Sequence, residues 1–194
     1  RIARARTIQE ALTFSAAGLG FDSYVFGIVA NDRRPDAESR TYVITDQVDT
    51  WVRMYDERAY LELDPRVELA SEPGYSFWEA RQFDKNPGHK VFLKEAGENG
   101  IQSGLVIGLC TRDPPSYAML SFNRAAPTLQ RWTAEQRLFV AGQASMLGKV
   151  LSRTVRRFLN EQELLFPAPP MKLNNRERDI LTLAAAGKTS KEIA

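Results

Sequence analysis

The chain has 194 residues, 43% of them hydrophobic, which is enough for one full core and a small appendage. Its 26 basic and 24 acidic residues nearly cancel, so the overall charge indicates no polyanionic partner. A single histidine and a single cysteine exclude an internal disulfide and argue against a structural zinc site.

The sequence also argues against an enzyme. It contains no glycine-rich phosphate loop and no cluster of metal ligands. The carboxylates of Glu57, Glu62 and Asp64 could imitate an acid pair, but charged helix faces are common. We therefore expect no catalytic activity, no metal and no cofactor. Cys110 lies in the apolar run GLVIGLC and is expected to be a buried thiol.

Two features bear on localisation. No apolar stretch approaches the ~20 residues that a membrane-spanning helix needs. The N-terminal segment RIARARTIQEALTF lacks the apolar core and cleavage site of a signal peptide. We expect a cytoplasmic protein that does not associate with membranes, and because the chain begins at Arg1, we expect a few residues to precede it.

In chain order, the first expected element is a helix over residues 2–17 that ends at Gly18 and Gly20. Aromatic and β-branched residues then predict a strand over 21–30 and a second strand over 40–45. The polar run NDRRPDAES connects the two strands as a loop.

The pattern becomes helical over residues 46–63, which we expect to form one helix ended by Asp64-Pro65. Its apolar stripe consists of Val48, Trp51, Val52, Tyr55 and Ala59. The segment 71–83 is rich in turn residues, with Trp78 in its middle. A short helix is expected over 88–99.

Two further strands are predicted over 101–110 and 117–123. Thr133 and Gln136 have capping-box spacing and predict a long helix that runs to about residue 165. Its apolar face contains Val140, Ala144, Leu147, Leu151, Val155 and Phe158. The fold class predicted is α+β, with an antiparallel sheet sandwiched by helices.

The last residues predict a second, incomplete domain. The run FPAPP cannot continue a helix and indicates a linker, which we place at 166–172. In LNNRERDILTLAAAGKTSKEIA, residues 173–194, the pairs Asn174/Glu177 and Thr189/Glu192 each have capping-box spacing, and Gly187 separates them. This pattern is typical of a helix-turn-helix, although an ordinary helical hairpin fits it about equally well.

The same segment closely resembles the opening of the DNA-binding domain of LuxR-type transcription regulators. The resemblance implies that the full-length protein binds double-stranded DNA and that the recognition helix would follow the last residue present. Within that domain we single out Arg176, Lys188, Thr189 and Lys191. Residues 1–165 would then form the sensor domain.

The stretch WVRMYDERAYLELDP, with Trp78 and with Gly104 in GIQSGL, looks like the autoinducer-binding domain of the acyl-homoserine-lactone receptors. The resemblance covers nearly all of residues 1–165. It implies that the Trp51 indole donates to the lactone carbonyl, that Asp64 accepts the ligand's amide N–H, and that Tyr55 and Trp78 line the pocket. By their placement on predicted strands, Ser121 could donate to the amide carbonyl, and Val25, Val29 and Leu105 could line the acyl pocket.

Each of these residues also has a purely structural explanation. Trp51 and Tyr55, four residues apart, are a common pair of core aromatics, and Trp78 could equally anchor a core. Asp64 before a proline is most often a turn or helix-end residue.

Two residues depart from the family pattern. Gln47 occupies a position where many receptors have a tyrosine, and it could still donate a hydrogen bond. Arg66 replaces a small or β-branched residue; if it points inward, it would pair with Asp64 or shrink the pocket. An orphan regulator that needs no lactone, or binds another small molecule, is therefore a second interpretation within the family. A third is a truncated regulator that inactivates full-length partners by forming mixed dimers.

The long helix is also a candidate dimer element. A regulator with two DNA-binding heads requires a two-fold dimer, and the apolar face of the helix over 133–165 could supply its interface. The alternative is that this face only covers the sheet. We expect a homodimer.

Overall fold

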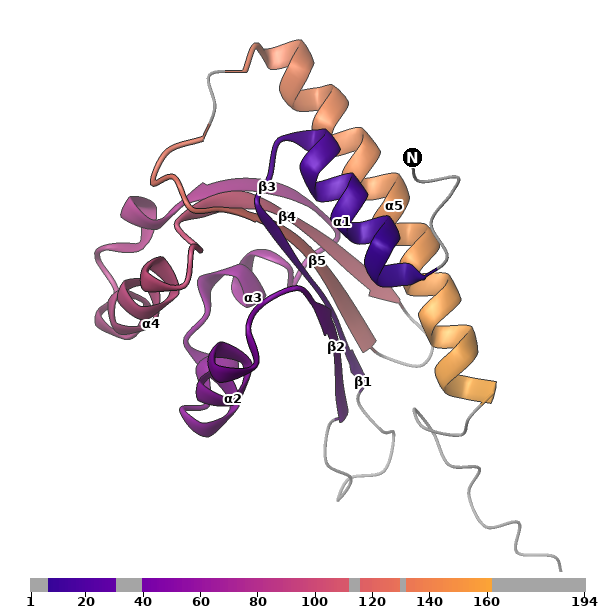
Figure 1. The fold of residues 1–194 in the computed structure, drawn as a ribbon, viewed down its shortest axis with the longest axis horizontal. Helices are drawn as coiled ribbons and strands as arrows, with labels where there is room; N and C mark the ends of the chain where they lie inside the picture. Colours follow the sequence, from indigo (N-terminus) through magenta and orange to yellow (C-terminus); the bar gives the residue numbers. More distant parts are fainter. Residues whose placement is uncertain (1–6, 31–39, 112–115, 130–131, 162–194) are drawn as a thin grey trace, which may run out of the picture.

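The computed structural model describes residues 7–30, 40–111, 116–129 and 132–161. They form one five-stranded sheet in the order β2-β1-β5-β4-β3, in which every neighbouring pair is antiparallel. Helices cover both faces (Figure 1). The α+β fold expected of residues 1–165 is confirmed for the described part. The predicted linker 166–172 and helix pair 173–194 lie outside the described residues and stay predictions.

Helices alternate with one or two strands along the chain, and the long helix α5 comes last. The helices are α1 (Ile8–Leu19), α2 (Asp49–Glu57), α3 (Pro65–Leu69), α4 (Pro87–Glu98) and α5 (Ala134–Glu161), with 3₁₀ turns η2 (Tyr60–Glu62) and η3 (Ala80–Phe83). The strands are β1 (Ser23–Ala30), β2 (Arg40–Thr45), β3 (Gly74–Glu79), β4 (Ser103–Thr111) and β5 (Ser116–Arg124). In the described ranges, no helix combines the length and the apolar character that crossing a bilayer requires.

Helices α1 and α5 pack together on one face of the sheet (Figure 1). Alternate residues of the strands point to this face because successive side chains of a strand point to opposite sides. The strand residues of this core include Tyr24, Phe26, Ile28, Leu105, Ile107, Leu109, Leu120 and Phe122. The helices contribute Leu12, Ala16, Val140, Ala144, Leu151, Val155 and Leu159.

Helices α2, α3 and α4 lie on the opposite face (Figure 1). A second core forms there around two tryptophans and the aromatic residues that contact them. Its buried members are Trp51, Tyr60, Ala70, Trp78, Phe92, Leu93, Ala96, Ile101 and Val106. The two cores are thus separated by the sheet, and the second one contains Trp51 and Trp78, two of the residues predicted to bind a ligand.

The helix expected over residues 46–63 is wrong in its extent. It is divided at Ala59, whose φ of 50° is the one left-handed backbone among the described residues other than glycine. Helix α2 ends before this position and η2 follows it. Asp64 does not merely end a helix: its side chain caps α3, whose first residue is Pro65.

Residues 71–83 were expected to be turn-rich, yet Gly74–Glu79 forms the edge strand β3. The other predicted elements match to within a few residues where the structure describes them. The capping box of α5 is confirmed: the Thr133 N–H donates to Gln136 Oε1 at 2.9 Å, and the Gln136 N–H donates to Thr133 Oγ1 at 3.2 Å. Phe158 is an exception on the predicted apolar face of α5, because it is exposed and Leu159 is buried instead.

Candidate ligand-binding site

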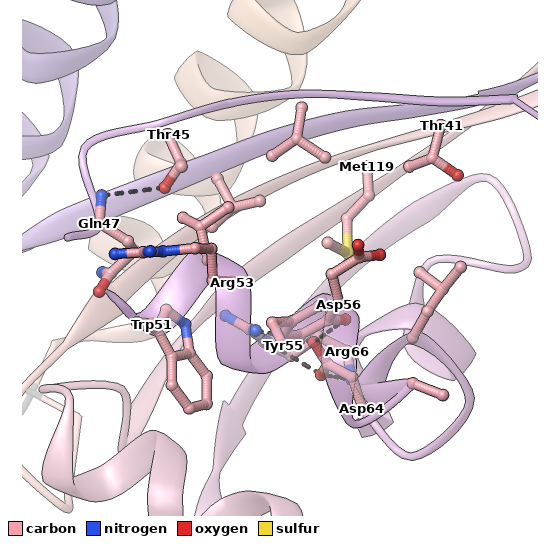
Figure 2. A pocket seen from close by; sticks show the side chains of 15 residues that line it. Thr41, Thr45, Gln47, Trp51, Arg53, Tyr55, Asp56, Asp64, Arg66 and Met119 are labelled. Atoms are coloured by element: carbon pink, nitrogen blue, oxygen red, sulfur yellow. Dashed lines mark hydrogen bonds and ion pairs between the residues drawn. The ribbon is translucent and has the colours of Figure 1, made fainter. Parts of the chain in front are cut away.

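A cavity of about 370 Å³ lies between the sheet and the segment formed by α2, η2 and α3 (Figure 2). This volume falls in the range of small-molecule sites, about 300–1,000 Å³. The lining residues are Val25, Thr41, Val43, Thr45, Gln47, Trp51, Val52, Arg53, Tyr55, Asp56, Ala59, Leu61, Asp64, Arg66 and Met119.

Strands β1, β2 and β5 form one wall. Thr41, Val43 and Thr45 alternate along β2 and therefore share a face. The register aligns Val25 with Thr45 across β1 and β2, and Met119 with Gly27 across β5 and β1. The wall consists of aliphatic and sulfur-containing side chains with two threonine hydroxyls among them. Such a surface suits a flexible alkyl chain better than a charged group of a ligand.

Helix α2 forms the opposite wall and carries Trp51 and Tyr55, one turn apart. Their rings meet edge to face with centroids 6.1 Å apart. Trp51 is buried and also contacts the rings of Tyr60 and Phe92, each at 6.0 Å. In Figure 2 the indole nitrogen of Trp51 lies on the side of the ring that faces the strands. The ring is thus fixed by packing, while its N–H remains directed toward the cavity.

Asp64 and Arg66 form a buried ion pair at the far end of the cavity. Arg66 Nη2 lies 2.7 Å from Asp64 Oδ2, and both side chains are almost fully excluded from solvent. Arg66 Nε adds a bond of 2.9 Å to Oδ1, and the Tyr55 hydroxyl donates to Oδ2 at 3.0 Å. Burial alone would lower the pKa of Arg66, but the adjacent Asp64 carboxylate outweighs it and raises that pKa. Arg66 therefore keeps its positive charge, and two of its nitrogens bond the Asp64 carboxylate.

A chain of polar side chains continues from this pair to the sheet. Arg66 Nη1 donates to Asn123 Oδ1 at 3.0 Å, and the Ser121 hydroxyl donates to the same oxygen at 2.8 Å. Asn123 Nδ2 reaches the Ser23 hydroxyl at 3.5 Å, to which Gln47 Nε2 also donates at 2.8 Å. One connected network therefore links Asp64, Ser121 and Gln47, three of the residues predicted to hold the polar part of a ligand.

The structure brings together five of the residues predicted from the sequence. Trp51, Tyr55, Asp64, Gln47 and Val25 all line the cavity. The possible pocket modifier, Arg66, also lines it and points inward to Asp64. Arg66 thus has the inward orientation, and it pairs with Asp64.

The other four predicted residues do not line the cavity. Trp78 is fully buried on the same face, beneath the Arg66 guanidinium, whose carbon lies 5.9 Å from the indole centroid. Ser121 is buried and engaged with Asn123. Val29 is buried on the same strand face as Val25 and lies opposite the lining residue Thr41, but it does not itself line the cavity. Leu105 lies on the other face of the sheet, where it packs in the core with α1 and α5.

Sequence reasoning missed two groups of residues. The first is the alternating set on β2, which the 40–45 strand prediction could have supplied once β2 was paired with β1. The second is Ser23 and Asn123, which complete the polar network and lie opposite each other across β1 and β5. No sequence signal distinguishes a buried asparagine of this kind from a surface one.

Some predictions fall outside the described residues. Arg176, Lys188, Thr189 and Lys191 lie in residues 162–194, and the side chain of Cys110 is also outside the described part.

Comparison with known proteins identifies the fold and the family. A model of the autoinducer binding domain matches residues 4–155. The transcriptional activator protein AnoR of Acinetobacter nosocomialis is 28% identical over 188 residues, which are 95% of this chain and 74% of that protein. The activator AhyR of Aeromonas hydrophila is 25% identical over 183 residues, which are 91% of this chain and 66% of that protein.

Solved structures share the fold. The crystal structure of Escherichia coli SdiA has a TM-score of 0.63 and 22% identity, covering 100% of this chain and 78% of that one. The lactone-dependent LuxR family factor CepR2 of Burkholderia cenocepacia has a TM-score of 0.60 and 23% identity, covering 78% of this chain and 87% of that one. The family match spans most of the chain and the cavity lies within it, so this chain belongs to the autoinducer binding domain family of LuxR-type transcription regulators.

Proposed function

We propose that this chain is the sensor part of a quorum-sensing transcription regulator and that its cavity binds an N-acyl-homoserine lactone. The observation that carries the proposal is the cavity itself: an apolar strand wall faces a fixed indole N–H, and a polar network closes one end. A lactone with an acyl tail has the same division into a polar head and an apolar chain. Trp51 is the proposed donor to the ring carbonyl, with the acyl chain against Val25, Val43 and Met119.

A panel of N-acyl-homoserine lactones of graded acyl length tests this proposal by thermal unfolding. A ligand at 100 times its dissociation constant stabilises the native state by about 2.7 kcal/mol. For a chain of this size, that corresponds to a rise in Tm of about 5–10 °C. Homoserine lactone without an acyl chain is the control, since it offers the head group alone. Absence of a shift at every acyl length would overturn the lactone assignment.

The second candidate function is an orphan regulator, which binds another small molecule or acts without one. The Asp64–Arg66 pair favours it, because the carboxylate proposed to accept the ligand's amide N–H already has a partner in the protein. The two candidates share the cavity and differ in the head group that it accepts. The same melting panel separates them if it includes acyl compounds without a lactone ring.

We further propose that the regulator is a homodimer and that its C-terminal segment, when complete, binds double-stranded DNA. The dimer proposal rests on α5, where Leu138, Phe139, Met146 and Val150 are each more than half exposed. The last three repeat at intervals of seven and four residues and so share one stripe of the helix. This stripe is distinct from the buried face that covers the sheet. An exposed apolar stripe on a long helix is typical of a helix–helix interface.

A further inference from the structure

The carboxylate of Asp64 has no acceptor position left for a ligand. An ionised carboxylate offers about four lone-pair sites. Oδ1 accepts the backbone N–H of Arg66 and its Nε–H, each at 2.9 Å. Oδ2 accepts Arg66 Nη2–H at 2.7 Å and the Tyr55 hydroxyl at 3.0 Å. The protein itself therefore supplies four donors to this one group.

Arg66 is held from several sides, so it is not a mobile arm that a ligand could move aside. Its Nη1 donates to Asn123, and that asparagine is bonded in turn to Ser121. The guanidinium carbon lies 5.6 Å from the Phe92 centroid and 5.9 Å from that of Trp78. Moving Arg66 away would separate two buried opposite charges. Asp64 would then lose a positively charged partner and several hydrogen bonds. A neutral amide N–H of a ligand would give it one hydrogen bond and no charge in return.

What Arg66 and Trp51 can offer a ligand at this end of the cavity is therefore a set of donors. A guanidinium has five N–H groups. Asp64 and Asn123 take three of those on Arg66, which leaves one on each terminal nitrogen. The Trp51 indole is a donor without any acceptor capacity. Both residues line the cavity.

The charges along the cavity do not favour an anion. Arg66 is neutralised by Asp64, and the other two charged lining residues, Arg53 and Asp56, are of opposite sign and exposed. A ligand with a full negative charge would find no unbalanced positive charge in the cavity, and it would lose its hydration on binding. A neutral head group with carbonyl or ester oxygens meets the available donors without that cost.

We infer that Arg66 is a specificity-determining residue, and that the cavity selects neutral acyl ligands whose head group is rich in oxygen acceptors and gives no advantage to an amide N–H. This inference rests on the proposed function, since it concerns the same cavity and an acyl ligand. It adds the chemical class of the head group. An amide N–H buried beside the occupied carboxylate would lose its hydrogen bond to water and gain none from Asp64.

Two compounds that differ in one atom test the inference. They are N-octanoyl-homoserine lactone and the ester in which oxygen replaces its amide N–H, α-octanoyloxy-γ-butyrolactone. Isothermal titration of the 194-residue chain gives a dissociation constant for each. We expect the ester to bind at least as tightly as the amide. Binding of the amide at least tenfold more tightly than the ester would overturn the inference and leave the proposed function intact.

The substitution Arg66→Met removes the guanidinium and keeps much of the side chain's volume. Because it frees Asp64, we expect the variant to prefer the amide over the ester by at least tenfold. Arg81→Met is the matched control, since Arg81 is exposed and outside the cavity, and its preference should equal that of the unchanged chain. If Arg66→Met folds and its preference is also unchanged, Arg66 does not set specificity. If it does not fold, the comparison in the unchanged chain still decides.

The same titrations distinguish a failure of the proposed function from a failure of the head-group inference. If neither compound binds the unchanged chain or the Arg66→Met variant, the cavity does not take acyl lactones, and the proposed function fails together with this inference. If the unchanged chain binds the ester alone, the acyl-binding role stands and the head-group assignment is supported.

Discussion

Gly104 lies directly opposite Trp78 across the β3–β4 ladder, and the indole occupies the space that a side chain on Gly104 would fill. A Cβ at this position would lie 2.9 Å from Trp78 Nε1 and 2.1 Å from the carbonyl oxygen of Phe122. Trp78 in turn supports Arg66 from below. The absence of a side chain at Gly104 therefore lets the Trp78 indole pack close to β4, and the position of that indole in turn fixes where the Arg66 guanidinium lies.

The substitution Gly104→Ala should accordingly destabilise the fold. Because the clash involves backbone on a neighbouring strand, we expect a loss of about 2–4 kcal/mol, at or above the usual range for overpacking. Urea denaturation measures it. The matched control is Gly142→Ala on α5, where an added Cβ meets nothing within 4 Å, and where replacing a helical glycine should stabilise by about 0.5–1 kcal/mol. Equal effects at both positions would contradict the packing argument.

Trp51→Phe tests the indole as a ligand donor. The substitution keeps an aromatic ring against Tyr60 and Phe92 but removes the N–H. We expect the affinity for the preferred acyl ligand to fall about tenfold, or about 1.4 kcal/mol. Trp132→Phe is the control, because Trp132 contacts Phe21 and Phe77 beside the other core. If both variants bind alike, the Trp51 N–H makes no bond to the ligand.

The energy of the Asp64–Arg66 pair can be measured by a double-mutant cycle with Asp64→Asn and Arg66→Met. Each single change leaves a buried polar group without its partner and should cost about 3–5 kcal/mol. The double variant should cost much less than the sum of the two. The exposed pair Arg157–Glu161, with an N–O distance of 2.8 Å, serves as the comparison and should show a coupling below about 1 kcal/mol. Additive effects at Asp64 and Arg66 would mean that the pair is not coupled.

The lowered pKa of Glu95, on helix α4, makes the free energy of unfolding depend on pH. The Tyr60 hydroxyl donates to Glu95 at 2.6 Å, and this bond, together with Arg58, lowers the pKa of Glu95 below its ordinary value of 4.5. A lowered carboxyl pKa contributes stability above the unfolded-state pKa, and that contribution is lost as the pH falls through the folded-state pKa. Glu95→Gln should therefore lose less stability than the unchanged chain between about pH 6 and about pH 3. Glu98→Gln, exposed on the same helix, is the control and should follow the unchanged chain.

The dimer proposal is tested by Val150→Glu, which adds a charge to the exposed stripe of α5. Light scattering coupled to size-exclusion chromatography should show a change from dimer to monomer, because burying an unpaired carboxylate in an apolar interface is costly. Val91→Glu on α4 is the matched control, since Val91 is similarly exposed on a different element. An unchanged mass for Val150→Glu would place the interface elsewhere. Leu151 is unsuitable for this test because it is buried in the core and its substitution would unfold the domain.

Local signals in the sequence were sufficient for most of the elements. The aromatic and β-branched residues of RTYVIT predict β2 with its observed bounds, and the Thr133–Gln136 box predicts the start of α5. The segment 46–63 was misjudged because its apolar spacing continues past Ala59, and nothing in the sequence shows that Ala59 adopts a left-handed backbone. Strand β3 was missed because Pro73 and Gly74 are turn residues, and only pairing with β4 makes the following segment a strand.

The site was only partly predictable, for reasons of geometry. Trp51, Tyr55 and Asp64 could be grouped because they lie within one short segment. Leu105 could not be assigned to a face, since both faces of β4 are buried and the run GLVIGLC has no polar alternation. The direction of Arg66 depends on Asn123, which is 57 residues away in the chain. Long-range partners of this kind leave no mark on local periodicity.

The position of β2 in the sheet affects how the cavity could adapt to its occupant. β2 is an edge strand and is bonded only to β1 within the described sheet, while Arg66, which pairs with Asp64, is hydrogen-bonded to Asn123 on the interior strand β5. An outward displacement of β2 would break only its hydrogen bonds to β1. A displacement of the Asp64–Arg66 end would break a buried ion pair and its bond to β5. Longer or bulkier ligands should therefore be accommodated by movement of β2, which carries Thr41 and Val43. The Asp64–Arg66 end of the cavity should keep the same geometry with each ligand.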